Sequence, residues 1–394
     1  MGQHLFYARC RHCGYAHPLN ETVCKITGAK LTPTKGLSSQ HRKAATALSS
    51  SATGGSSGPR LATLLGRIVG GKYRVIREIG HGGASTVYEC LDCKSGENVA
   101  LKVPLEEMAA SETNLRRFYQ EAKVIGAIRH HSVCALIDSG QLENGVPYIV
   151  LELLRGESLQ VRIDRRGPLD FEEACAVGLQ VLEALAFTHE LQVIHRDIKP
   201  ANVFLCVDRQ VKVLDFGISR WLSHDGPSLT PAGRIMGTPV YLAPEQMKME
   251  SIDGRVDIYA TGIVLQECLF GRTPFAAQTL DELLREILEV GPIPVRVGRR
   301  DCPSVLASVL ERAVHRDRDQ RFSTAAEMYN SLRFAWSSLP GRKYEPPPQL
   351  RRTLPASPLR VPPNFSLRVV APVTKNIVAP KSESNDDVTP LSRV

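Results

Sequence analysis

Two short segments of the chain carry side chains that could act on a phosphate group. The segments HRDIKPAN and VKVLDFG contain two acids, a lysine and an amide, namely Asp197, Lys199, Asn202 and Asp215. Carboxylate and amide oxygens are hard ligands that suit Mg²⁺, a carboxylate can accept a hydroxyl proton, and an ammonium group can hold a phosphate. Each acid alone could be a turn residue, but the order and spacing of the whole set leave little room for chance.

A glycine-rich segment, IGHGGASTVY, lies at residues 79–88. Taken alone it is weak evidence for phosphate binding, because hairpins also use glycine to reach positive φ. Ser85 stands at the third glycine position of G-x-G-x-x-G, no helix follows closely, and the chain has no Gly-Lys-Ser or Gly-Lys-Thr. The sequence therefore excludes a dinucleotide-binding fold and a P-loop NTPase.

A lysine and a glutamate further along the chain could form an ion pair. Lys102 ends the apolar stretch VALK, where a solvated surface lysine is the commoner explanation, and Glu121 lies in a helical stretch at residues 118–128. A fixed ion pair between that strand and that helix would hold the ammonium group towards the α- and β-phosphates of a nucleotide.

The elements that must position these residues change in kind along the chain. Residues 73–100 alternate apolar and polar side chains with Gly, Asp and Asn between the runs, which predicts a meander of antiparallel strands. After Thr113, apolar residues at steps of three and four predict helices at residues 115–128, 171–191, 256–270, 280–290 and 324–336. This order predicts an α+β fold with a small sheet lobe, a larger helical lobe and a ligand between them.

With these motifs in this order, residues 67–336 resemble a Hanks-type protein kinase of the bacterial serine/threonine branch. The resemblance implies a bilobal protein kinase-like fold with an antiparallel β-sheet N-lobe and a helical C-lobe. It also implies transfer of the γ-phosphoryl group of Mg-ATP to protein Ser/Thr hydroxyls, with autophosphorylation and signal transduction as the expected setting. ATP and Mg²⁺ are the implied cofactors, and protein substrates the implied partners.

The resemblance also implies roles for single residues. The expected catalytic residues are Asp197, Lys199, Asn202, Lys102 and Glu121. Asn202 and Asp215 would hold Mg²⁺. Nucleotide binding is expected at the glycine-rich turn, the following strand and the backbone after the gatekeeper position, with the residues Ile79, Gly80, Gly82, Gly83, Ser85, Val87, Ala100, Lys102, Glu152 and Leu154.

Two features of the motifs indicate the substrate class. Lys199, two residues after Asp197, and Thr238 in the segment GTPVY resemble the serine/threonine form of the family rather than the tyrosine form. Among structural residues, an ion pair is expected between Glu245 and Arg321, although a solvated arginine is the alternative for Arg321. Asp257 is expected to cap the backbone of the catalytic loop.

Regulation by phosphorylation is a hypothesis that rests on two arginines. Arg196 precedes Asp197, and Arg220 follows the DFG run. Together they could bind a phosphate on the activation segment and order it by charge-assisted hydrogen bonds. Thr230 is the first candidate for the phosphorylated residue, and Ser228 is the second.

The N-terminal segment, residues 1–31, contains a Cys-rich pattern. Cys10, Cys13 and Cys24 form C-x₂-C-x₁₀-C, which resembles a zinc ribbon, but Thr27 stands where a fourth cysteine is expected. A histidine or a water could complete a Zn²⁺ site, and a metal-free remnant or a redox dithiol is equally compatible with the pattern. The second CxxC, at residues 90–93, has no partner pair nearby and reads as ordinary packing and turn cysteines.

Composition sets the remaining boundaries of the chain. Of 394 residues, 43% are apolar and 23% charged, which is enough for a substantial core. Residues 32–66 are rich in Ser, Thr, Ala and Gly and are expected to form a flexible linker, whereas residues 337–394 are expected to form a disordered Pro/Arg-rich tail.

Neither a signal peptide nor a membrane span is expected, so a cytoplasmic protein is the default.

Charge is distributed unevenly and bears on the partners. The net charge of +8 comes from the flanks, which carry +7 over residues 1–66 and +5 over residues 337–394, while residues 67–336 carry −4. The charge distribution therefore does not predict nucleic acid as a partner. Homodimerisation for autophosphorylation in trans is a further expectation from the family. The alternative functions are a catalytically silent pseudokinase scaffold and a zinc-dependent nucleic-acid-binding regulator.

Overall fold

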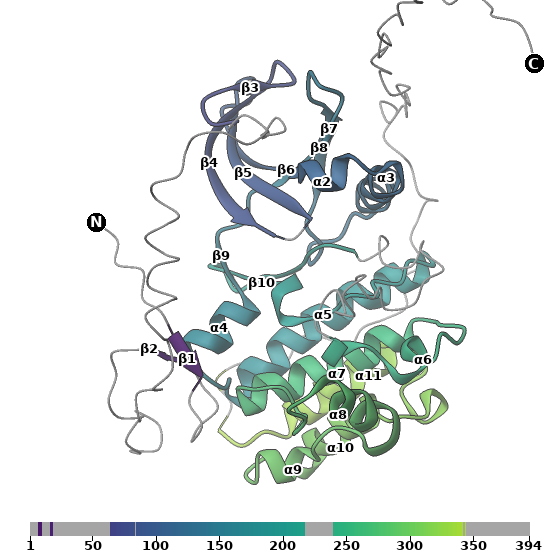
Figure 1. Ribbon diagram of the computed structural model, residues 1–394. Coiled ribbons are helices and arrows are strands. Elements are labelled where there is room, and N and C mark those ends of the chain that lie inside the picture. The colour runs from purple at the N-terminus through teal and green to yellow at the C-terminus, as the bar shows by residue number, and fades with distance from the viewer. Residues whose placement is uncertain are drawn as a thin grey trace, which may run out of the picture. The chain divides into compact units, whose positions relative to one another are not determined.

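The computed structural model describes residues 7–9, 16–18, 64–82, 84–216, 239–341 and 343 (Figure 1). By its internal contacts the chain divides into two units, Met1–Ala62 and Thr63–Val394. In the first unit, strands β1 (Tyr7–Arg9) and β2 (Ala16–Pro18) pair antiparallel, with Tyr7 opposite Pro18. The fold and the candidate site that follow belong to the second unit.

The first part of the second unit is a six-stranded antiparallel sheet in the order β3-β4-β5-β6-β8-β7. This confirms the predicted meander. Its strands are β3 (Ile68–Val69), β4 (Tyr73–His81), β5 (Ser85–Asp92), β6 (Asn98–Pro104), β7 (Leu136–Gln141) and β8 (Pro147–Glu152).

The edge-side strand β4 begins with an alternating pattern, whereas the central strands β6 and β8 are buried along most of their length. Tyr73 and Val75 of β4 are buried while Arg74 between them is exposed. They pack with Leu101 of the central strand β6 and with Cys90 of β5 in one apolar cluster. The predicted packing role of Cys90 is therefore confirmed, and Cys93 is an exposed free thiol.

Helices α2 (Glu106–Ala109) and α3 (Glu112–Ala127) follow the third strand of the meander and lie beside the sheet (Figure 1). Helix α3 begins where Ser111 Oγ accepts the Asn114 N–H at 3.4 Å, a standard N-cap arrangement. Its apolar face buries Phe118, Ala122 and Ile125. This places the acid in the middle of α3, Glu121, on the same buried side.

The remaining described residues of the second unit form a mainly helical lobe, which lies below the sheet in Figure 1. Its core joins α5, α7, α10 and α11, and α5 alone buries ten residues. The elements are α4 (Leu159–Arg166), α5 (Phe171–Glu190), α6 (Pro244–Met247), α7 (Arg255–Phe270), α8 (Leu280–Arg285), η4 (Glu286–Val290), α9 (Val295–Gly298), α10 (Ser304–Ala313) and α11 (Ala325–Ser337), with short helices η1 (Pro200–Asn202), η3 (Pro239–Tyr241) and η5 (Arg318–Gln320). The predicted α+β, bilobal architecture is confirmed.

One predicted helix differs in detail. The stretch 280–290 is an α-helix only as far as Arg285, and it continues as the π-helix η4. The backbone N–H of Gly291 donates to the carbonyl of Glu286 at 2.7 Å, five residues back, and Gly291 has a φ of 96°. Glycine reaches this φ without steric cost, so the widened turn can end there.

Among the helices that the structure describes, none is both long and apolar enough to cross a lipid bilayer.

Candidate functional site

A short hairpin brings the amide and the second acid of the predicted site together. Strands β9 (Gly156–Ser158), β10 (Val203–Cys206) and β11 (Val211–Val213) form a three-stranded sheet in the order β11-β10-β9. Val203 pairs with Val213, and the Leu214 N–H donates to the Asn202 carbonyl at 2.8 Å. Asn202, just before β10, therefore lies beside the segment that carries Asp215.

The loop before this hairpin places three polar side chains in direct contact. Lys199 Nζ lies 2.6 Å from Asp197 Oδ2, and Asn202 Nδ2 donates to the same oxygen at 2.9 Å and to the Asp197 carbonyl at 2.8 Å. Asn202 is buried at the end of η1. The Asp197 carboxylate is thus fixed by a cation and an amide, which leaves little freedom in its orientation.

Lys102 links this region to the sheet. It lies in β6, and its Nζ is 3.2 Å from Glu121 Oε1 in α3 and 2.5 Å from Asp215 Oδ1 after β11. The predicted Lys102–Glu121 pair is present, and the contact with Asp215 is an addition to it. Burial by itself disfavours the charged ammonium, but the two carboxylates outweigh it and raise the pKa of Lys102.

The two carboxylates beside Lys102 differ in their electrostatics. Burial raises the pKa of Glu121, with the nearby Asp215 charge adding to the effect and Lys102 opposing it. Burial also acts to raise the pKa of Asp215, but the charge and hydrogen bond of Lys102 outweigh it and lower that pKa. The Asp215 side chain is 51% exposed and that of Glu121 is 11% exposed, so Asp215 is the more accessible carboxylate of the pair.

The backbone at Asp215 is held in an uncommon conformation. Its φ is 47°, in the left-handed region that non-glycine residues seldom occupy. The next residue, Phe216, is 1% exposed and its ring lies 4.6 Å from the ring of His195, whose Nε2 is 2.9 Å from the Leu214 carbonyl. Packing of Phe216 and the His195 contact hold the strained turn in place.

Asp257, at the start of α7, organises the catalytic-loop backbone as predicted. Its Oδ2 accepts the His195 N–H at 2.8 Å, and its Oδ1 accepts the Arg196 N–H at 2.7 Å, where Arg196 has a φ of 66°. His189 Nε2 contacts the same carboxylate at 2.8 Å. The contribution of His189 was not predicted, because a single histidine near the end of a helix carries no local signal of its partner.

The predicted nucleotide-binding residues lie along the first strands. Gly80 of β4 pairs with Val87 of β5, and the Gly82 N–H donates to the Ser85 carbonyl at 3.0 Å. Ala100 is buried in β6, and Ile79 is exposed in β4.

The backbone after the gatekeeper position is braced from the C-lobe. The side chain of Glu152, at the end of β8, accepts the Ala135 N–H at 2.8 Å and contacts Lys212 Nζ of β11 at 2.7 Å. Leu154, two residues on, is half-buried. The pair between Glu152 and Lys212 was not predicted, since both residues look like ordinary strand-end charges in the sequence.

The predicted ion pair between Glu245 and Arg321 is present and buried. The guanidinium donates to both carboxylate oxygens, at 2.7 and 2.8 Å, and also to backbone carbonyls including that of His315 at 2.6 Å. It lies 4.9 Å from the ring centroid of Tyr259. This pair joins α6 to the segment before α11.

Several predicted residues lie outside the described residues, so the structure says nothing of them. They are Gly83, Arg220, Ser228, Thr230, Thr238, Cys10, Cys13, Cys24 and Thr27.

Comparisons with known proteins agree with this geometry. Residues 73–333 match the family model of the protein kinase domain. The chain is 35% identical over 264 residues to the serine/threonine-protein kinase PknB of Mycolicibacterium smegmatis, covering 66% of this chain and 42% of that protein. It is 34% identical over 273 residues to the probable serine/threonine-protein kinase PknB of Bifidobacterium longum, covering 67% and 40%.

A solved structure shows the same fold. The crystal structure of the Mycobacterium tuberculosis PknI kinase domain superimposes with a TM-score of 0.56 at 26% identity, covering 70% of this chain and 100% of that one. The matched part of the present chain spans only 40–42% of the length of the curated relatives named above.

Proposed function

The chain belongs to the protein kinase domain family, and from this premise we propose that it is a serine/threonine protein kinase that transfers the γ-phosphoryl group of ATP to protein hydroxyl groups. One observation carries the proposal. Lys102, held by Glu121, meets Asp215 across the two lobes, while Asp197 and Asn202 are locked together next to the same hairpin. A non-catalytic scaffold has no physical need for all of these residues.

The donor set fits Mg²⁺. The side-chain amide nitrogen of Asn202 donates to Asp197, so the side-chain oxygen of Asn202 is available to bind a cation. Asp215 offers an ionised, half-exposed carboxylate. Such hard oxygen ligands are the ones Mg²⁺ prefers. Held by these two residues, Mg²⁺ would neutralise charge on the phosphate groups of ATP.

We assign the chemical step to Asp197. Its Oδ2 is fixed by Lys199 and Asn202, so the carboxylate can orient an incoming Ser or Thr hydroxyl and accept its proton. The ammonium group of Lys199, beside that carboxylate, would contact the transferred phosphoryl group. Lys102 would hold the α- and β-phosphates, with Glu121 keeping it in position.

The glycines of the β4-β5 turn support a nucleotide above this site. A Cβ added at Gly80 would approach no atom closer than 3.8 Å, one added at Gly82 none closer than 3.7 Å, and neither residue has a positive φ. Neither packing nor backbone conformation therefore requires glycine at these positions. Close approach of a ligand to the backbone is the remaining physical reason for glycine.

The remaining predicted nucleotide contacts are part of the same proposal. Ile79, Val87 and Ala100 would form the apolar walls around the adenine. The backbone of Glu152 and Leu154 would bind its edge. The brace between Glu152 and Lys212 would keep that backbone in place.

A kinase assay with Mg-ATP and a mixed Ser/Thr/Tyr peptide library tests the proposal, with Asp197→Asn as the inactive control. We expect phosphate on Ser and Thr from the parent protein and not from the variant. Equal incorporation by both proteins, or phosphotyrosine alone, would refute the assignment. Nucleotide binding without transfer by the parent would favour the pseudokinase scaffold instead.

Regulation at Arg196 forms a second part of the proposal. Its backbone N–H is bound by Asp257. Burial lowers the pKa of the Arg196 guanidinium, which means that it disfavours the charged form, so a phosphate dianion nearby would stabilise that charge. We propose that Arg196, with Arg220, binds a phosphate on Thr230 or, failing that, on Ser228. Mass spectrometry after incubation with Mg-ATP tests this, and no phosphate between residues 219 and 234 would exclude it.

For the N-terminal unit we propose the zinc-ribbon-like knuckle expected from the sequence. In the sequence, Cys10 and Cys13 fall between the residues that form the paired strands β1 and β2, a spacing that is compatible with knuckle ligands. Metal analysis of the full chain and of a variant with Cys10, Cys13 and Cys24 replaced by serine tests the site. Equal zinc in both proteins would exclude it. Salt-sensitive RNA or DNA binding by the parent would favour the nucleic-acid-binding alternative.

The remaining expectations are also proposals. The domain limits of 1–31, 32–66, 67–336 and 337–394 can be tested by limited proteolysis, which should cut first within 32–66 and 337–394. Homodimerisation for autophosphorylation in trans predicts that, at concentrations where the protein is mostly monomeric, the autophosphorylation rate rises with the square of protein concentration. Cell fractionation tests the cytoplasmic location.

A further inference from the structure

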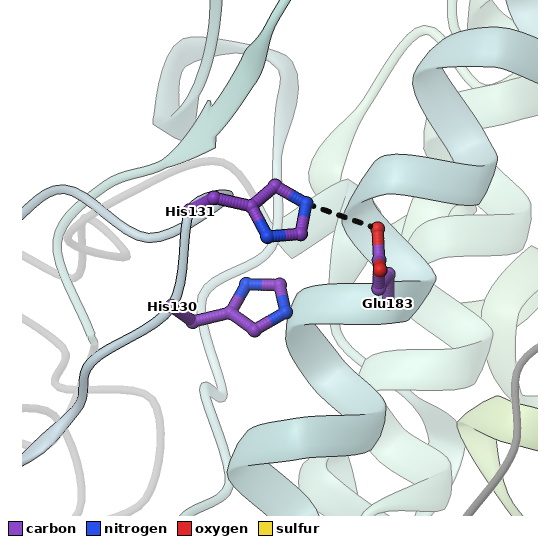
Figure 2. A group of neighbouring side chains, drawn as sticks. All are labelled: His130, His131 and Glu183. Carbon is purple, nitrogen blue, oxygen red and sulfur yellow. Dashed lines mark hydrogen bonds and ion pairs between the residues drawn. The ribbon is translucent and has the colours of Figure 1, made fainter.

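A cluster of metal-ligating side chains lies apart from the site described above, between helix α5 and the loop that joins α3 to β7 (Figure 2). His130 and His131 are consecutive in that loop, and Glu183 projects from α5. One ligand atom from each residue lies within 4.8 Å of the other two. His131 Nε2 and the Glu183 carboxylate are 3.2 Å apart.

We propose that His130, His131 and Glu183 form a zinc site that ties the α3–β7 loop to helix α5. Two imidazoles and one carboxylate are an established zinc ligand set, with water in the fourth position. In a tetrahedral site with bonds of about 2.0–2.1 Å, two ligand atoms lie about 3.3 Å apart. The observed 3.2 Å matches that spacing, and the metal would take the place of the proton now shared by these two atoms.

The two histidine rings are held in position before any metal binds. Their centroids are 4.3 Å apart with an interplanar angle of 28°, and the His130 ring also packs against Phe187, 5.1 Å away and one turn after Glu183 on α5. Restricted rings lose little conformational freedom on binding. Against this, His130 Nδ1 accepts the Ser132 N–H at 3.1 Å, and that bond is lost when the ring becomes a ligand.

The charges around the cluster also permit a cation. Glu183 supplies one negative charge. Lys212 acts electrostatically on His130, but its ammonium group lies 2.7 Å from Glu152, which compensates its charge. Since the loop directly follows the helix that carries Glu121, a bound metal would hold the end of that helix against the C-lobe.

Zinc titration of the full chain tests the proposal. Because cysteines can also bind zinc, the parent for this experiment carries Cys10→Ser, Cys13→Ser and Cys24→Ser, and calorimetry is done without nucleotide. We expect one Zn²⁺ per chain. His131→Ala and Glu183→Gln should each weaken binding at least about tenfold, whereas Glu190→Gln, which removes a carboxylate elsewhere on α5, should not.

Thermal unfolding provides a second measurement that does not depend on enzyme activity. Zinc should raise the Tm of the parent and of Glu190→Gln, and it should leave the Tm of the two ligand variants unchanged. Circular dichroism without metal shows whether each variant is folded, and His131→Gln replaces His131→Ala if the latter is not. No zinc binding by the parent, or equal affinity in the ligand variants, would overturn the proposal.

Discussion

Lys102 bridges two carboxylates that come from different lobes. Its Nζ lies 3.2 Å from Glu121 Oε1 in α3 and 2.5 Å from Asp215 Oδ1, which is 113 positions away in the sequence. The ammonium group thus joins the sheet lobe to the segment after β11. Its charge keeps Asp215 ionised, since it lowers the pKa of that carboxyl against the effect of burial.

We expect Lys102→Met to lower kcat/KM for peptide phosphorylation by at least about 100-fold, because the charge that would stabilise the phosphates is lost. The matched control is Lys72→Met, which removes an exposed lysine paired with Asp138 at 2.9 Å. That variant should keep nearly full activity. A loss of less than about tenfold in Lys102→Met would contradict the role given to the ammonium group.

Gly82→Ala should separate nucleotide binding from stability. A Cβ at this position would lie 3.7 Å from the Ser85 carbonyl oxygen, an ordinary contact, so the free energy of unfolding should change by less than about 0.5 kcal/mol. The KM for ATP should rise several-fold, because the methyl group occupies the space that the phosphates would use. Kinetic measurements and urea unfolding test the two parts separately.

Gly262→Ala is the control with the opposite expectation. A Cβ on this buried residue of α7 would lie 2.6 Å from Val314 Cγ1 and 2.9 Å from Ala313 Cβ. Overpacking of this kind costs about 1–3 kcal/mol. The KM for ATP should be unchanged, and a raised KM in this variant alone would contradict the assignment of the nucleotide site.

Much of the fold could be predicted because local patterns specify it. Alternation in residues 73–100 indicates the strands, and three- and four-residue spacing indicates α5 and α11, because each of these helices buries one face. Helix α7 is buried on all sides over Val256–Phe270, so its segment is mostly apolar. The Lys102–Glu121 and Glu245–Arg321 pairs could be predicted only through the resemblance to a known family.

Other contacts carry no local signal. His189 with Asp257 and Lys212 with Glu152 join residues 68 and 60 positions apart, and each side chain alone is typical of an ordinary surface charge. The π-helix at residues 286–290 also escapes prediction, since its apolar spacing is still nearly helical. Such features depend on tertiary packing rather than on neighbouring residues in the chain.

The buried pair of Glu245 and Arg321 should be important for stability. Arg321→Met leaves a buried carboxylate without a cation, and we expect it to lower the free energy of unfolding by about 3–5 kcal/mol. Arg116→Met, at the exposed pair with Glu112, should change it by less than about 0.5 kcal/mol. Urea denaturation measures both values.

A double variant tests the cause of that loss. When Glu245→Leu is added to Arg321→Met, the uncompensated charge disappears, so part of the lost stability should return. If the double variant is less stable than Arg321→Met, packing rather than the unpaired charge accounts for the effect.

Glu267 should make stability depend on pH. This residue of α7 accepts the Tyr241 O–H at 2.7 Å, and burial raises the pKa of its carboxyl from 4.5 to about 7. Between these values the folded state binds more protons than the unfolded state, so stability must fall as pH rises. A shift of this size corresponds to a loss of about 3 kcal/mol between pH 4.5 and pH 7.

Glu267→Gln should remove this pH dependence, because the amide stays neutral and its carbonyl oxygen can still accept the Tyr241 hydroxyl. The free energy of unfolding, measured by urea denaturation at several pH values from 5 to 8, should then fall less steeply with pH than in the parent. Glu143→Gln, which replaces an exposed glutamate, should keep the parental slope. Parallel pH curves for the parent and Glu267→Gln would mean that the carboxylate is already ionised in the folded protein, stabilised by groups other than Tyr241.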